Sequence, residues 1–124
     1  MAKNKIEKEL PVKRLSYTIE HLLKANEIYV LEEETNRFGL SSFEGGDLLS
    51  FWPTEEIALK NAKGRWENFT PRKFTITEME VILDLIEDKK WSLDIFPMDS
   101  KTGVILSVDE FVDNLNKAYK FLNE

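Results

Sequence analysis

The fold of this chain is decided by the stretch Leu48-Leu49-Ser50-Phe51-Trp52-Pro53-Thr54-Glu55-Glu56-Ile57-Ala58. An apolar run typical of a buried strand ends at a proline, which cannot donate a backbone hydrogen bond. Thr54 then occupies the position of a helix N-cap, and Glu55 and Glu56 follow where the helix dipole favours negative charge. The stretch therefore predicts a buried strand over residues 48–52 that passes directly into a short helix.

Two more strands are predicted upstream of this stretch. Residues 28–31 have the β-branched and aromatic composition of a strand, and residues 37–43 return as a second one after an acidic turn. The glycine pair in residues 44–47 predicts a tight turn into the strand at 48–52, because glycine accepts positive φ at little cost. These three strands are expected to form an antiparallel meander.

Downstream, two further strands are predicted. The aromatic segment 65–74 is expected to be irregular, and residues 91–96 alternate in polarity and predict a strand that stops at Phe96-Pro97. A turn then leads into a fifth strand over residues 104–106.

Four helices are predicted from apolar periodicity and capping signals. They cover residues 11–26, residues 55–63, residues 77–88 after a capping box at Thr77 and Glu80, and residues 108–122 after one at Ser107 and Glu110. The third is expected to be largely buried. The core sides are predicted to be Val12, Leu15, Ile19, Leu22 and Leu23 in the first helix, and Val108, Phe111, Val112, Leu115, Ala118, Tyr119 and Leu122 in the last.

These elements predict an α+β fold in which a mostly antiparallel sheet of about five strands packs with about four helices, in the order α-β-β-β-α-α-β-β-α. Residues 11–124 are expected to form a single domain, and the charged residues 1–10 a flexible N-terminal segment.

Composition excludes several classes of protein. The 124 residues include eight Phe, three Trp and three Tyr but no cysteine, which argues against disorder and excludes disulfides and thiolate catalysis. No apolar segment approaches the roughly 20 residues that cross a bilayer, and the charged start lacks a signal core. We therefore predict a cytoplasmic protein with no membrane partner.

Charge is unevenly placed along the chain. Residues 1–24 hold six Lys and Arg against three Glu, so this segment is basic. The rest of the chain is therefore more negative than the net charge of −6 of the whole protein. An acidic domain is poorly suited to binding a nucleic-acid phosphate backbone, because nonspecific affinity for nucleic acid comes largely from Lys and Arg side chains. The charge predicts no nucleic-acid partner, and it is compatible either with a basic protein partner or with solubility alone.

Several short motifs occur in a fixed order along the chain. They are Ile28-Tyr29-Val30-Leu31, Phe51-Trp52-Pro53 with Ala58, Trp66 with Pro71, Phe96-Pro97, Gly103-Val104 and the closing amphipathic helix. Their order and spacing resemble a family of small bacterial proteins known as domain of unknown function 2750, over about residues 15–122. The first hairpin departs from the pattern, because Gly39 lies late and an acidic run precedes it. The resemblance implies a small cytosolic bacterial α+β protein and brings no activity or catalytic residue.

The residues that could carry chemistry do not converge in the sequence. His21 is the only histidine, so a metal site would be almost entirely carboxylate, and no nucleophile-elbow sequence supports a Ser-His-Asp site. Neighbouring carboxylates in residues 32–34 point in different directions in a strand or turn, and no Gly-rich phosphate loop occurs. We predict no catalytic residue, no cofactor and no metal site.

Six residues on two surfaces are the candidates for partner binding. They are Arg65, Trp66, Phe69 and Arg72 in the aromatic segment, and Tyr17 and His21 on the polar side of the first helix, which is basic because it also carries Lys13, Arg14 and Lys24. Tryptophan and arginine are enriched together among binding hot spots. The alternatives are a loop ring that seals the core edge and a simply solvated helix face.

Three functions remain open from the sequence. The favoured one is a non-enzymatic protein-interaction module, monomeric or homodimeric, of the inhibitor or immunity type. The second is an enzyme that uses a carboxylate pair, with Asp94, Glu80 or Asp84 as candidates. The third is a small-ligand pocket lined by Trp52, Trp66 and Trp91.

Overall fold

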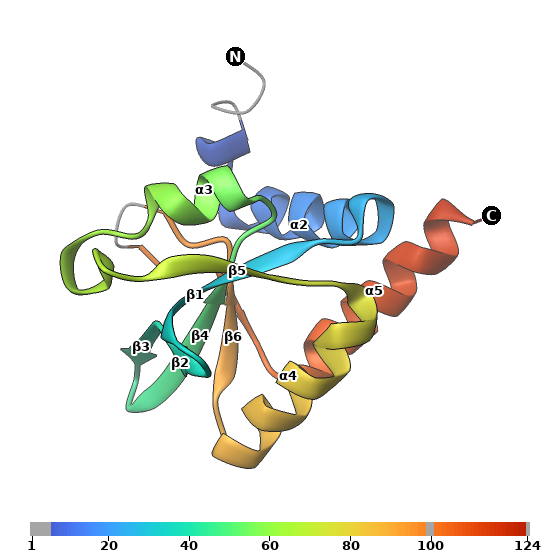
Figure 1. The fold of residues 1–124 in the computed structure, drawn as a ribbon. Helices are drawn as coiled ribbons and strands as arrows, with labels where there is room; N and C mark the ends of the chain where they lie inside the picture. Colours follow the sequence, from blue (N-terminus) through green and yellow to red (C-terminus); the bar gives the residue numbers. More distant parts are fainter. Residues whose placement is uncertain (1–5, 99–100, 124) are drawn as a thin grey trace.

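The structure is a computed structural model that describes residues 6–98 and 101–123. Its elements are α2 (Pro11–Ala25), β1 (Ile28–Glu34), β2 (Arg37–Phe38), β3 (Leu40–Phe43), β4 (Gly46–Phe51), α3 (Glu55–Lys60), the short 3-10 helix η1 (Gly64–Trp66), β5 (Thr70–Phe74), α4 (Ile76–Lys89), β6 (Ser92–Ile95), β7 (Val104–Leu106) and α5 (Val108–Leu122). Helices and strands pack together as the predicted α+β class requires (Figure 1). Within the described ranges, no helix has the length and apolarity needed to span a bilayer.

The strands form two sheets, so the prediction of a single, mostly antiparallel sheet is wrong. One sheet has the order β2-β1-β5 and is antiparallel throughout. The other has the order β3-β4-β6-β7, and its central strands β4 and β6 are parallel. Between them the chain runs through α3, β5 and α4, and this long crossover lets β6 return in the direction of β4.

Two corrections concern the strands themselves. The strand expected over residues 37–43 is divided at Gly39, whose N–H donates to the Leu31 carbonyl oxygen at 2.9 Å, and the chain there passes from one sheet to the other. The segment 65–74, expected to be irregular, ends in strand β5, in which Pro71 is the register partner of Leu31. Proline is tolerated there because β5 lies at the edge of its sheet.

Helix α4 begins earlier than predicted. Its N-cap is Thr75 rather than Thr77, and the capping box is completed by the Glu78 side chain, which accepts from the Thr75 N–H at 2.9 Å. The second predicted capping box, formed by Ser107 and Glu110 at the start of α5, is confirmed. Thr54 caps α3 as expected, since its hydroxyl accepts from the Ile57 N–H at 3.2 Å.

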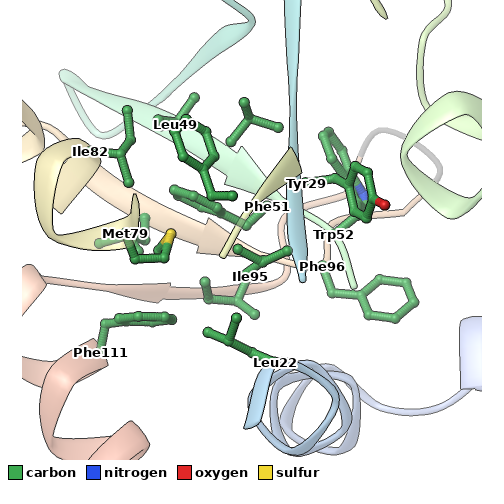
Figure 2. Close-up of a cluster of buried hydrophobic side chains, with 14 of the residues drawn as sticks. Leu22, Tyr29, Leu49, Phe51, Trp52, Met79, Ile82, Ile95, Phe96 and Phe111 are labelled. Atoms are coloured by element: carbon green, nitrogen blue, oxygen red, sulfur yellow. The ribbon is translucent and has the colours of Figure 1, made fainter. Parts of the chain in front are cut away.

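The core gathers apolar side chains from both sheets and from helices α2, α3, α4 and α5 (Figure 2). Phe51 and Ile95 are register partners on β4 and β6, and both are fully buried. Leu22 of α2, Met79 of α4 and Phe111 of α5 complete this cluster and are at most 2% exposed. Aromatic and aliphatic residues of both sheets thus share one core cluster.

The helix faces are less regular than the apolar periodicity predicts. On α2, Val12 was expected in the core but is exposed, whereas Arg14, placed on the polar side, is buried. Val81 is exposed, so α4 is not largely buried. Val112 and Tyr119 of α5 also lie outside the core, because α5 buries only Phe111 fully.

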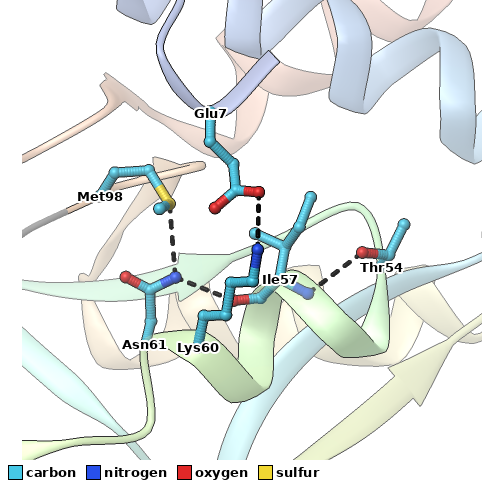
Figure 3. A network of polar contacts seen from close by, with 6 residues as sticks. All are labelled: Glu7, Thr54, Ile57, Lys60, Asn61 and Met98. Carbon is cyan, nitrogen blue, oxygen red and sulfur yellow. Dashed lines mark hydrogen bonds and ion pairs between the residues drawn. The ribbon is translucent and has the colours of Figure 1, made fainter. Parts of the chain in front are cut away.

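Residues before α2 contact the body of the domain. Ile6 packs against the core cluster, and the Glu7 carboxylate pairs with the Lys60 ammonium at 3.0 Å (Figure 3). Residues 1–5 of the segment predicted to be flexible lie outside the described residues.

Candidate functional site

A cavity of about 330 Å³ lies at the carboxyl ends of the parallel strands β4 and β6. Each of these strands runs into an aromatic residue and a proline, Trp52-Pro53 in one case and Phe96-Pro97 in the other. Trp52 and Pro97 both line the cavity, and the Trp52 indole N–H donates to the Pro97 carbonyl oxygen at 2.9 Å. Carboxyl ends of parallel strands are a usual place for ligand sites in open sheets.

Two buried polar side chains, Ser50 and Asp94, lie side by side in this cavity. They are register partners on β4 and β6, so both project from the sheet face opposite to that of Phe51 and Ile95. Ser50 is 1% exposed and Asp94 is 2% exposed, and both line the cavity. Among the described residues the Ser50 hydroxyl has no hydrogen-bond partner.

The Asp94 carboxylate is held in a position that disfavours its charge. Burial raises the pKa of Asp94 to about 6, although the Gly103 N–H donates to its Oδ1 at 2.7 Å and the positive charge of Arg14 acts in the opposite direction. Desolvation therefore outweighs both stabilising interactions. Near neutral pH, Asp94 is ready to gain or lose a proton.

Replacing Asp94 by asparagine is expected to stabilise the protein above about pH 6. An aspartate with a folded-state pKa above its unfolded value contributes stability at low pH and loses it as the pH rises through the folded-state pKa. The two values, 3.8 and about 6, set an upper limit of about 3 kcal/mol for this loss. The asparagine of the Asp94→Asn variant would keep an acceptor for Gly103 and carry no charge.

Urea unfolding of both proteins at pH 5 and pH 7.5 measures this effect. The free energy of unfolding of Asp94→Asn relative to the parent should rise by about 1–2 kcal/mol between the two pH values. If the two proteins differed in free energy of unfolding by the same amount at both pH values, the pKa of Asp94 would be the same in the folded and unfolded chains.

Aromatic rings form the wall of the cavity beside these polar groups. The Trp52 and Trp66 rings meet edge to face, with centroids 6.3 Å apart and planes at 80°. Trp66 lies against Gly39, where a Cβ atom would be 3.1 Å from the indole ring. A side chain at position 39 would therefore displace the Trp66 ring or the backbone beside it.

The rim of the cavity is basic, although the chain as a whole is acidic. Lys63, Arg65 and Lys101 line it and are exposed. Asn61, at the end of α3, is held by its Nδ2 group, which donates to the Ile57 carbonyl oxygen at 2.9 Å and to the Met98 sulfur at 3.4 Å (Figure 3). The cavity thus combines a polar floor, an aromatic wall and a cationic rim.

The backbone is strained where β6 leaves the cavity. Phe96 is fully buried and has φ of 59°, which costs a bulky residue about 1–2 kcal/mol. Arg14 supports this conformation, because its Nε donates to the Phe96 carbonyl oxygen at 2.9 Å and its guanidinium lies 5.6 Å from the ring centroid. The buried arginine therefore shapes the turn that carries Pro97 into the cavity.

The six predicted binding residues do not form one site. Arg65 and Trp66 line the cavity. Phe69 packs against the core cluster, and the Arg72 guanidinium pairs with the Glu32 carboxylate at 2.6 Å while lying over the Phe74 ring. Their role in partner binding stays a prediction.

Tyr17 and His21 lie together on α2, away from the cavity. Their rings stack with centroids 5.9 Å apart, and His21 Nε2 lies 2.7 Å from a Glu27 carboxylate oxygen. The other Glu27 oxygen accepts from the Tyr29 hydroxyl, and burial followed by this hydrogen bond raises the pKa of Tyr29 to about 12. These contacts fix the start of β1.

The pairing of Ser50 with Asp94 was missed by the sequence analysis. Its signal is a repeated pattern, in which a polar residue stands three positions before the proline in both Ser50-Phe51-Trp52-Pro53 and Asp94-Ile95-Phe96-Pro97. Only the parallel register places the two polar residues next to each other. Trp52 and Trp66 of the predicted aromatic pocket do line the cavity, whereas Trp91 belongs to another part of the surface.

The cavity contains a single carboxylate among its described lining residues. Of the three carboxylates considered for catalysis, Asp94 lines it, and Glu80 and Asp84 lie on α4. Across residues 6–98 and 101–123, no group of three His, Cys, Asp or Glu side chains is placed to hold a metal ion.

Comparison with known proteins gives one match. The family model described as "Protein of unknown function (DUF2750)" matches residues 15–115. No curated protein and no solved structure matches the chain.

Proposed function

Because the chain belongs to the DUF2750 family of proteins of unknown function, we propose its function from the cavity itself: it is a domain that binds a small molecule. The observation that carries the proposal is the buried Ser50 hydroxyl, which has no partner among the described residues, beside the buried Asp94 carboxyl. A buried polar group without a partner costs about 1–3 kcal/mol. An unpartnered hydroxyl next to a carboxyl whose charge is disfavoured by burial, both facing one cavity, is expected where a ligand satisfies them.

The three parts of the cavity define the chemical class of the ligand. Ser50 and Asp94 offer acceptors to an N–H or O–H group, and Trp52 and Trp66 offer an apolar wall to a ring. Lys63, Arg65 and Lys101 favour an anionic group at the rim. The proposed ligand is therefore a compact, ring-bearing acid with at least one hydrogen-bond donor on the ring.

Binding is proposed rather than catalysis because the described lining residues include no pair of reacting groups. His21 belongs to the Tyr17 and Glu27 cluster, so it gives Ser50 no general base. Asp94 has no second carboxylate beside it in the described part of the lining, so acid and base roles cannot be divided between two groups.

Thermal denaturation with a series of ring-bearing acids tests the proposal. Indole-3-acetate represents the carboxylates of the series and adenosine 5′-monophosphate the phosphates. An acid that binds in the cavity should raise the melting temperature of the protein by several degrees at saturating concentration. Ser50→Ala and Trp66→Ala should each lose most of this shift, since they remove the acceptor and the ring wall.

Val81→Ala is the matched control, because Val81 is exposed on α4 and does not line the cavity. Its ligand-induced shift should equal that of the parent protein. The proposal fails if no acid of the series shifts the parent, or if the shift survives in both cavity variants.

The protein-interaction module predicted from the sequence remains a second candidate. The observation that favours it is the exposure of apolar side chains on one side of α5, with Val112 at 36% and Tyr119 at 58%. Exposed apolar side chains that adjoin on one helix face are typical of contact surfaces.

A further inference from the structure

Helix α5 presents an apolar face that the rest of the described chain does not cover. Val112 is 36% exposed and Tyr119 is 58% exposed, although both continue the apolar stripe that buries Phe111. Beside Tyr119, a groove is lined by Leu23 of α2, Ile76 of α4 and Leu115 of α5. Figure 1 shows the end of α5 extending away from the strands.

We propose that this face binds the same face of a second copy of the chain, with the two α5 helices antiparallel. Asp109, Val112, Asn116, Tyr119 and Lys120 share one side of α5, because they follow each other at helical spacings of three and four residues. In an antiparallel pair that crosses near Leu115, Val112 of each copy meets Tyr119 of the other. In the same register, Lys120 of each copy lies within two residues, about 3 Å along the helix axis, of Asp109 of the other.

The charges on this face identify a second copy as the partner. Asp113 and Lys117 form an ion pair within the helix at 2.9 Å, whereas Asp109 and Lys120 have no ion pair among the described residues. One acidic and one basic group at opposite ends of the face make it self-complementary, as a two-fold interface requires. A strongly basic partner would gain from Asp109 but be repelled by Lys120.

Sedimentation equilibrium of the full chain across a concentration series tests the proposal. The parent protein should show a reversible monomer–dimer equilibrium. Tyr119→Ser should weaken dimerisation about tenfold or more, since it removes an apolar contact twice in each dimer. Lys120→Glu and Asp109→Lys should each weaken it several-fold, because each brings like charges together twice.

The double variant Asp109→Lys/Lys120→Glu distinguishes this register from any other. It exchanges the two charges and should return the dimer constant towards that of the parent protein. Phe121→Ser is the matched control, because Phe121 is 75% exposed and lies on another side of α5. It should leave the constant unchanged.

Circular dichroism melts of every variant establish whether the fold is kept, as expected for exposed positions. A parent protein that stays monomeric at all concentrations overturns the proposal. So does a dimer that is insensitive to Tyr119→Ser, or one that the double variant fails to restore.

Discussion

Replacing Gly103 by alanine is expected to destabilise the protein by about 3 kcal/mol or more. An added Cβ would lie 1.9 Å from the Ile95 carbonyl oxygen and 2.9 Å from the Phe96 carbonyl carbon. Both are backbone atoms, so β6 and β7 would have to separate where Ile95 pairs with Val104. The same movement would withdraw the Gly103 N–H from the Asp94 carboxylate and leave this buried group without its donor.

Urea unfolding measures the loss, and Gly46→Ala is its matched control. Gly46 also lies in the four-stranded sheet, but a Cβ there would have only an ordinary contact, 3.7 Å from the Phe43 carbonyl oxygen. The control should change the free energy of unfolding by less than about 1 kcal/mol. Equal effects at the two glycines would show that the close approach at Gly103 is relaxed at little cost.

Truncating Trp52 to alanine is expected to cost about 3–5 kcal/mol of stability. The side chain is 1% exposed and packs between the core and the cavity, so its removal leaves a large void. It also removes the indole N–H that donates to the Pro97 carbonyl oxygen. Because the void and the lost hydrogen bond both alter the wall of the cavity, the Trp52→Ala variant should lose ligand binding as well as stability.

Trp91→Ala is the comparison for this prediction. Trp91 is only half-buried just before β6, so its loss should cost clearly less than that of Trp52. Chemical denaturation of both variants, followed by far-UV circular dichroism, gives the two values. A smaller effect at Trp52 than at Trp91 would contradict the placement of Trp52 at the junction of core and cavity.

Local signals in the sequence predicted most of the helices and strands correctly. The strand that ends at Trp52-Pro53, the cap at Thr54 and the capping box at Ser107 all depend on neighbouring residues. Such short-range chemistry acts in the same way wherever the segment lies in the fold. For this reason it can be read without knowledge of the tertiary structure.

The errors arise where distant segments decide the outcome. β5 contains Pro71, Arg72 and Lys73, which weaken a strand signal, and it is a strand because β1 pairs with it. The parallel pairing of β4 and β6 depends on which strands meet across a long connection. Arg14 looks like a surface residue by periodicity, and the Phe96 carbonyl oxygen, distant in sequence, provides a partner that allows its burial.

The candidate site was predicted in part for the same reason. Trp52 and Trp66 were expected to line a pocket, and Asp94 was considered as a reactive carboxylate, but these belonged to separate hypotheses. Ser50 carried no signal by itself, since a serine in an apolar strand is common. Its importance comes from the register with Asp94, which depends on the pairing of two strands that are distant in sequence.

The contact between Tyr29 and Trp52 has a consequence for how the domain transmits strain. Two reciprocal backbone hydrogen bonds of 2.8 Å join the sheets at this point, and Trp52 is also a wall of the cavity. An interaction that restricts the motion of the indole therefore also restricts the backbone where the two sheets are joined. A molecule that packs against this ring would couple the two sheets, so that they unfold as a single cooperative unit.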